Sequence, residues 1–101
     1  MAGKQITISQ DKILISGELT FATVAAILES SRKLFPRLGS WSCDFSQVTH
    51  CDSAGLALLL EWLKMGRQRQ TKVRFSQLPQ QLLAIAIPAG LNTLLEAVTA
   101  D

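Results

Sequence analysis

The side chains best placed for chemistry in this 101-residue chain form one short motif, Asp52-Ser53-Ala54-Gly55. An apolar stretch with helical spacing follows directly, so the motif is expected at the N-terminus of a helix. Unpaired backbone N–H groups and the positive end of the helix dipole favour an anion there. Ser53 is therefore the candidate phosphate acceptor or partner contact, with Asp52 and Gly55 as supporting residues. The alternative is that Ser53 only caps its own helix, unless Asp52 takes that role.

Other reactive side chains give little support to catalysis or metal binding. No paired carboxylates, Ser-His-Asp set, Gly-x-Ser-x-Gly elbow or Gly-rich phosphate loop can be assembled. Cys43 and Cys51 are the only cysteines and His50 is the only histidine, which is too few for a zinc site. We expect reduced cysteines packed as small apolar residues and His50 in a loop. The expectation is no enzyme activity, no metal and no cofactor.

Composition predicts one globular domain over residues 1–101. Hydrophobic residues make up 48%, charged residues 18%, and the net charge is +2. This is enough apolar material for a core without disulfides or metal, and it disfavours disorder. The N-terminus lacks the apolar region of a signal peptide, and the longest apolar run, Leu82 to Leu91, is too short to span a membrane. We expect a cytoplasmic protein without direct membrane insertion.

The apolar pattern predicts the element order β-β-α-β-α-β-α-α. Alternation predicts strands at 6–9, 13–16, 40–45 and 72–76, and helical spacing predicts helices at 21–35, 53–67, 79–86 and 92–98. Gly17 is expected to break the second strand, Thr20 to cap the first helix, and residues 46–51 to form a loop. The fold class is α/β: a single mixed four-stranded sheet packed with about four helices.

The helix that begins at Ser53 is apolar on two sides. Four leucines share the side expected to pack on the sheet: Leu56, Leu59, Leu60 and Leu63. The opposite side carries Ala54, Leu58, Trp62 and Met65, which we call the tryptophan stripe. Polar residues are typical there, and Trp and Met are common in interfaces, so we expect a partner-binding face anchored by Trp62. The alternative is that the C-terminal helices cover this stripe.

A basic cluster follows this helix, with no acid between Glu61 and Glu96. It consists of Lys64, Arg67, Arg69, Lys72 and Arg74. One interpretation is a solvated helix end whose cations offset the dipole. The other is contact with an acidic partner or with anionic headgroups beneath a membrane transporter. Nucleic-acid binding is disfavoured, because the overall charge is small and no aromatic stacking set accompanies the cluster.

Three segments together resemble the STAS domain family, in order and spacing over nearly the whole chain. They are Gly17-Glu18-Leu19, Asp44-Phe45-Ser46-Gln47-Val48 and Asp52 to Leu60. The family includes anti-sigma-factor antagonists, cytosolic tails of SulP anion transporters and small subunits of lipid-transport ABC systems. Asp44 becomes a supporting motif residue through this resemblance. Thr20 departs from the pattern, which usually has an acid there, and this weighs against the sigma-factor pathway.

The chain looks most similar to the MlaB-like lipid-transport subunits, in its length, its leucine-rich run after the motif and its tail from Leu82 to Leu95. This resemblance implies a non-catalytic subunit that binds an MlaF-like ABC ATPase, partly through Ser53, and reaches the inner membrane through it. The complex would maintain outer-membrane lipid asymmetry by phospholipid transport. The alternative is an anti-sigma-factor antagonist switched by phosphorylation of Ser53. A nucleotide- or lipid-binding module has no pocket signature, and the isolated protein is a candidate homodimer.

Overall fold

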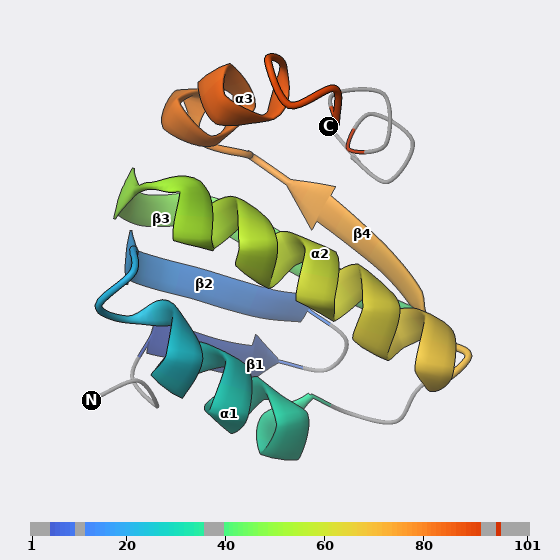
Figure 1. Ribbon diagram of the computed structural model, residues 1–101. Coiled ribbons are helices and arrows are strands. Elements are labelled where there is room, and N and C mark those ends of the chain that lie inside the picture. Colours follow the sequence, from blue (N-terminus) through green and yellow to red (C-terminus); the bar gives the residue numbers. More distant parts are fainter. Residues whose placement is uncertain (1–4, 10–11, 36–39, 92–94, 96–101) are drawn as a thin grey trace.

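A computed structural model describes residues 5–9, 12–35, 40–91 and 95 of the chain (Figure 1). Its elements are β1 (Ile6–Ser9), β2 (Lys12–Leu19), α1 (Val24–Leu34), β3 (Ser40–Cys51), α2 (Ser53–Gln68), β4 (Lys72–Ser76) and α3 (Gln80–Ala86). The predicted α/β order is confirmed as far as α3. The last predicted helix, over 92–98, lies outside the described residues except for Leu95.

The four strands form one mixed sheet in the order β1-β2-β3-β4. The first two strands pair antiparallel, and β2, β3 and β4 run parallel. Each of α1 and α2 returns the chain to the start of the next parallel strand (Figure 1). The C-terminal ends of β2 and β3 therefore meet the N-termini of both helices at one end of the molecule. The helix C-termini and the strand beginnings meet at the other end.

An aromatic cluster fills the core between the sheet and the helices. Trp41 and Phe45 lie on one face of β3, as their alternation predicts, and are buried. The Trp62 ring of α2 lies 5.1 Å from Phe35 and 6.2 Å from Phe45, measured between centroids. Phe45 in turn contacts Phe75 of β4 edge to face at 5.5 Å. Such pairs add specific geometry to the burial of large apolar surfaces.

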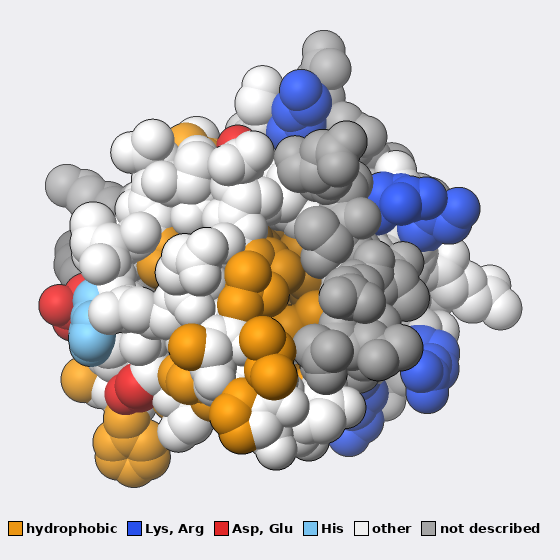
Figure 2. Space-filling view, turned by 90° about the horizontal axis from the view of Figure 1, so that it is seen from above, with side chains coloured by type: hydrophobic (Ala, Val, Ile, Leu, Met, Phe, Trp, Pro, Cys, Tyr) orange, Lys and Arg blue, Asp and Glu red, His pale blue; other side chains and the backbone are white. Residues whose placement is uncertain are grey.

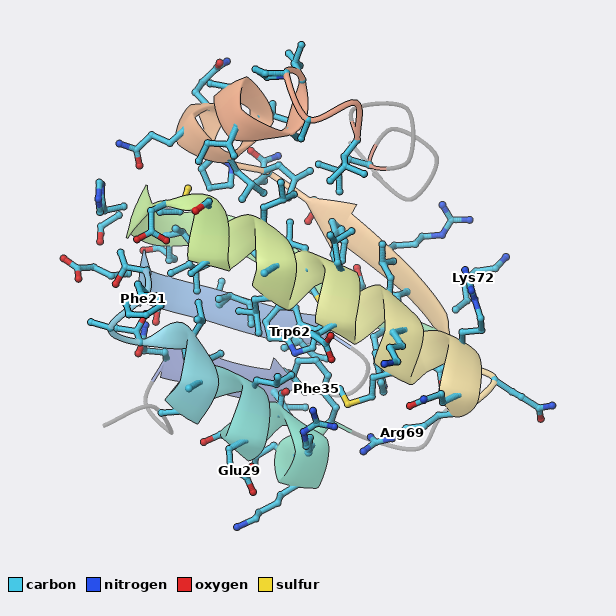
Figure 3. The ribbon with its side chains drawn as sticks, viewed as in Figure 1. Phe21, Glu29, Phe35, Trp62, Arg69 and Lys72 are labelled. Atoms are coloured by element: carbon cyan, nitrogen blue, oxygen red, sulfur yellow. The ribbon has the colours of Figure 1, made fainter. Side chains whose placement is uncertain are left out.

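Three of the four residues of the tryptophan stripe belong to this core, so the prediction that the stripe is an exposed face is wrong for them, while Ala54 is half-buried. Leu58, Trp62 and Met65 are only 2%, 0% and 4% exposed. Helix α1 covers Trp62, whose indole N–H donates to the Ser31 hydroxyl at 2.9 Å. Figure 3 shows Trp62 and Phe35 between α1 and α2. Because α2 packs against both α1 and α3, it needs apolar residues on more than one side.

The second strand does not break at Gly17, as was expected, but continues to Leu19. Gly17 adopts φ +83° where the register between β2 and β3 shifts, which glycine tolerates without steric cost. The side-chain amide of Gln5 donates to the carbonyls of Ser16 and Glu18, both at 2.9 Å, on either side of this bulge. A bulge bends the strand here instead of ending it.

Because β2 is longer than predicted, its neighbours β3 and α1 also differ from the prediction. β3 pairs with it as far as Cys51, so the predicted loop over 46–51 is wrong and His50 is an exposed strand residue. The first helix begins at Val24, and the prediction that Thr20 caps it is wrong. The Thr20 carbonyl instead accepts the N–H groups of Thr23 and Val24, both at 2.9 Å, in the turn before the helix.

Candidate functional site

Asp52, and not Ser53, caps α2. One carboxylate oxygen of Asp52 accepts the Ala54 N–H at 2.8 Å, and the Asp52 carbonyl accepts the Gly55 N–H at 2.9 Å. Ser53 is the first helical residue and is exposed. Since its neighbour performs the capping, the Ser53 hydroxyl is available for another contact.

The same carboxylate also fixes the turn between β2 and α1. Its second oxygen accepts the backbone N–H of Phe21 at 3.1 Å. This bond from Phe21 lowers the pKa of Asp52; partial desolvation acts against it, and the N–H groups of Ala54 and Gly55 add to it. The Phe21 ring itself is 88% exposed. Asp52 therefore holds a large apolar side chain in solvent close to Ser53.

Gly55 lets the motif sit directly over the end of β2. The Asp52 N–H donates to the Leu19 carbonyl at 3.2 Å. A Cβ at Gly55 would lie 2.9 Å from that carbonyl oxygen, which is closer than a side chain tolerates, and 3.3 Å from the Cβ of Cys51, which is a tight contact. The Gly-Glu-Leu and Asp-Ser-x-Gly segments are thus packed directly against each other, and this contact requires a glycine at position 55.

Neither cysteine is suited to act as a nucleophile. Both are free and buried, as expected from the sequence. Desolvation raises the pKa of Cys43 to about 12. Desolvation, and then the charge of Asp52, raises the pKa of Cys51. Within the described residues, no group of three His, Cys, Asp or Glu side chains is arranged to hold a metal ion.

An apolar groove of about 400 Å³ opens beside Ser53, between the N-terminal halves of α1 and α2. It is lined on one side by Phe21, Val24, Ala25 and Leu28, and on the other by Ser53, Ala54, Ala57, Leu58 and Glu61. We call this the α1–α2 groove. Of these residues, the sequence alone indicates Ser53, Ala54 and Leu58 as part of a site, but not Phe21 and Ala57. Phe21 has the helical spacing of the apolar residues Val24 and Leu28, so no signal in the sequence indicates that its ring is exposed.

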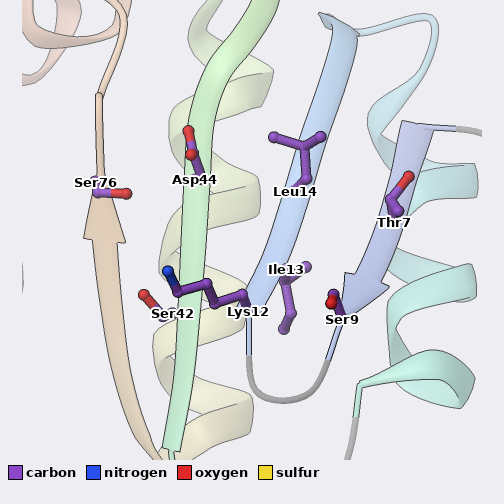
Figure 4. A pocket seen from close by; sticks show the side chains of 8 residues that line it. All are labelled: Thr7, Ser9, Lys12, Ile13, Leu14, Ser42, Asp44 and Ser76. Atoms are coloured by element: carbon purple, nitrogen blue, oxygen red, sulfur yellow. The ribbon is translucent and has the colours of Figure 1, made fainter.

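Asp44 lies away from this groove. It is on the face of the sheet opposite the helices, where one of its oxygens accepts the Ser46 N–H at 2.7 Å. A hollow of about 280 Å³ on that face is lined by Thr7, Ser9, Lys12, Ile13, Leu14, Ser42, Asp44 and Ser76 (Figure 4). Asp44 therefore makes a local hydrogen bond within β3. The structure does not bring it together with Asp52 and Ser53.

No helix in the described part of the chain has both the length and the apolarity of a membrane span. A family model described as "Mlab, STAS domain" (STAS_2) matches residues 2–96. No curated protein sequence matches the chain.

Solved structures share the fold at low identity. A sulfate transporter family protein from Wolinella succinogenes has a TM-score of 0.68 and 18% identity, over 92% of this chain and 79% of that chain. SLC26A9 has a TM-score of 0.67 and 15% identity over 79% of this chain, which spans only 16% of the SLC26A9 chain. The anti-sigma factor antagonist SpoIIAA in its unphosphorylated form has a TM-score of 0.57 and 15% identity, with 80% and 78% covered.

Proposed function

Since this chain belongs to the STAS_2 family, described as Mlab, STAS domain, we propose that it is a non-catalytic subunit that binds an ABC ATPase of the MlaF type. The match over residues 2–96 is the observation that carries this proposal. The ATPase would power phospholipid transport that maintains outer-membrane lipid asymmetry. In this role the protein is cytoplasmic and reaches the inner membrane through its partner.

The proposed contact surface is the α1–α2 groove together with Ser53. Phe21 presents an exposed aromatic ring next to this groove, and a few aromatic residues in apolar surroundings often dominate binding energy. Ser53 adds a hydroxyl that no capping bond occupies. This surface retains Ala54 and Leu58 of the tryptophan stripe, which line the groove, but not Trp62, which is inaccessible in the folded protein.

Binding alone does not change ATPase activity. A bound subunit regulates only if it has different affinities for the conformations of its partner. Alternatively, it stabilises the ATPase by binding its folded form and not its unfolded chain. The first route alters turnover per ATPase molecule, and the second alters the amount of folded ATPase.

The test is co-purification of partners from native membranes by tagged protein, with identification by mass spectrometry. Ala57→Glu places a carboxylate inside the α1–α2 groove, and Ala26→Glu places one on an exposed position of α1 outside it. We expect wild type and Ala26→Glu to recover an ABC ATPase with its permease. Ala57→Glu should recover about tenfold less, because a buried unpaired charge costs more than 1 kcal/mol. Equal recovery by Ala57→Glu would refute this surface.

A second candidate is an anti-sigma-factor antagonist switched by phosphorylation of Ser53. The exposed Ser53 hydroxyl and the fold shared with SpoIIAA favour it. A phosphate there would add about two negative charges beside Asp52 and the groove. Intact-mass analysis of protein from native cells separates the two functions. A species heavier by one phosphate, absent in Ser53→Ala and accompanied by a small kinase, would favour this candidate.

A further inference from the structure

Exposed cationic side chains collect at the end of the molecule opposite Ser53. They are Lys12 of β2, Arg32 and Lys33 of α1, Lys64 and Arg67 of α2, and Lys72 and Arg74 of β4; we call them the basic end. Figure 2 shows Lys and Arg gathered on one side of the molecule, with most Asp, Glu and His on the other. The parallel topology brings these separate segments together, because strand beginnings and helix C-termini share one end.

Helix dipoles explain only part of this arrangement. Arg32, Lys33 and Arg67 occupy the last turns of α1 and α2, where free carbonyl groups attract cations. Lys72 and Arg74 lie on a strand, and strands carry little net dipole. The strand cations therefore need a different explanation from the helical ones.

Arg69 is not part of the basic end, because its charged group is used in contacts within the protein. Its guanidinium donates to the carbonyls of Arg32 at 2.9 Å and Phe35 at 3.3 Å, and it lies 5.7 Å from the centroid of the Trp41 ring. Among the described residues, no side chain of the basic end makes a comparable bond. Their charges face solvent, as Lys72 does beside the end of α2 in Figure 3.

Few carboxylates offset these charges. Glu29 lies between one and two turns before the end of α1, Glu61 lies about two turns before the end of α2, and Asp44 shares the hollow on the open face of the sheet with Lys12. Glu61 shares a small polar cleft of about 120 Å³ with Arg32 and Lys64, so cations of two helices lie together there. The excess of positive charge therefore remains at the basic end.

We infer that the basic end binds a membrane surface that carries anionic phospholipid headgroups. Such a surface attracts clustered Lys and Arg without needing a shaped pocket. Four of the seven cations are lysines, and lysine is depleted in protein–protein interfaces. Leu34, next to Lys33, is 45% exposed and supplies an apolar side chain for the boundary between headgroups and acyl chains.

Ser53 and the basic-end residue Arg67 lie near opposite ends of α2, and Glu61 borders both the α1–α2 groove and the cleft that contains Lys64. This helix has 16 residues, which corresponds to a length of about 24 Å. A protein bound around Ser53 therefore leaves Arg67 and the strand cations of the basic end free, and the two contacts would reinforce each other on a membrane. The inference does not depend on the identity of the protein partner.

The test uses the purified full chain and two kinds of vesicle, phosphatidylcholine alone and an equimolar mixture with phosphatidylglycerol. In flotation assays we expect binding to the anionic vesicles only, decreasing as salt shortens the Debye length. The double variant Lys64→Gln/Arg67→Gln should lower the partition coefficient about tenfold, since each surface cation contributes to attraction. Both positions are exposed, so the folded state should be unaffected.

The matched control is Gln47→Glu/Thr49→Glu, which changes net charge by the same amount at exposed positions near the other end. It should retain binding within about twofold, because charges farther than a Debye length are screened. Wild-type protein that ignores anionic vesicles, or equal loss in both double variants, would overturn the inference. If a polyglutamate resin captured the protein and anionic vesicles did not, the inference would be overturned, and the partner of the basic end would be an acidic protein. Ala57→Glu should still bind vesicles, which separates this result from the proposed function.

Discussion

At the residue scale, Asp52 explains why the motif starts with a carboxylate. Its two oxygens serve two elements: one accepts the Ala54 N–H at the start of α2, and the other accepts the Phe21 N–H before α1. A serine or threonine would cap α2 with its single side-chain oxygen but would leave Phe21 without this acceptor. One side chain thus sets the position of both helix N-termini around the α1–α2 groove.

Asp52→Asn tests this role through its pH dependence. Because the folded-state pKa of Asp52 is lowered, its charge stabilises the protein fully above the ordinary value of 3.8. That contribution is lost as pH falls through the lowered pKa. The difference in urea midpoint between wild type and variant should therefore be largest near neutral pH and shrink on acidification. A difference that stays constant over this range would contradict the account.

Ser31 is a core residue whose structural role could not be predicted from the sequence. It is a polar residue on a helix, yet it is fully buried and accepts the indole N–H of Trp62. Ser31→Ala should lower the free energy of unfolding by about 1–3 kcal/mol, because the Trp62 N–H would lose its partner in the core. Urea denaturation measures this, with Ser30→Ala on the same helix as the control. Equal effects of the two substitutions would show that the bond contributes nothing.

At the element scale, apolar periodicity was sufficient to predict the strands, the three described helices and their order. It failed at the ends of β2 and β3, since Gly17 and residues 46–51 are typical of turns. The extension of β2 to Leu19 depends on contacts distant in sequence, namely its pairing with β3 as far as Cys51 and the Gln5 amide that bridges the bulge. It also failed for the tryptophan stripe, because a helical wheel shows which sides are apolar but not what covers them.

Gly55→Ala tests the close packing of α2 on β2. Helix propensity alone would make this change stabilising by about 1 kcal/mol. The steric contact with the Leu19 carbonyl oxygen, at 2.9 Å from the added Cβ, should reverse the sign. We expect a net loss of about 1–3 kcal/mol in the free energy of unfolding. A more stable variant in thermal or urea unfolding would mean that the helix is not this close to the strand.

At the scale of the whole molecule, the parallel topology separates two surfaces. One end presents Ser53, Phe21 and the α1–α2 groove, and the other presents the basic end. The sequence revealed part of each: the Asp-Ser-x-Gly motif for the first, and the basic cluster after residue 61 for the second. Lys12 and Arg32 are distant from that cluster in the sequence, and only the fold brings them to the same end of the molecule. The fold likewise brings Phe21 next to Ser53, although the two residues are far apart in the sequence.

The central claim is that the end bearing Ser53 contacts an ABC ATPase, and site-specific photo-cross-linking in native cells tests it most directly. A photoreactive residue replaces the exposed Ala22, next to Phe21, or Lys72 at the basic end as the control. We predict that position 22 cross-links to an ABC ATPase and that position 72 does not. Cross-linking of position 22 to a small kinase, or equal ATPase cross-linking from both positions, would contradict the account.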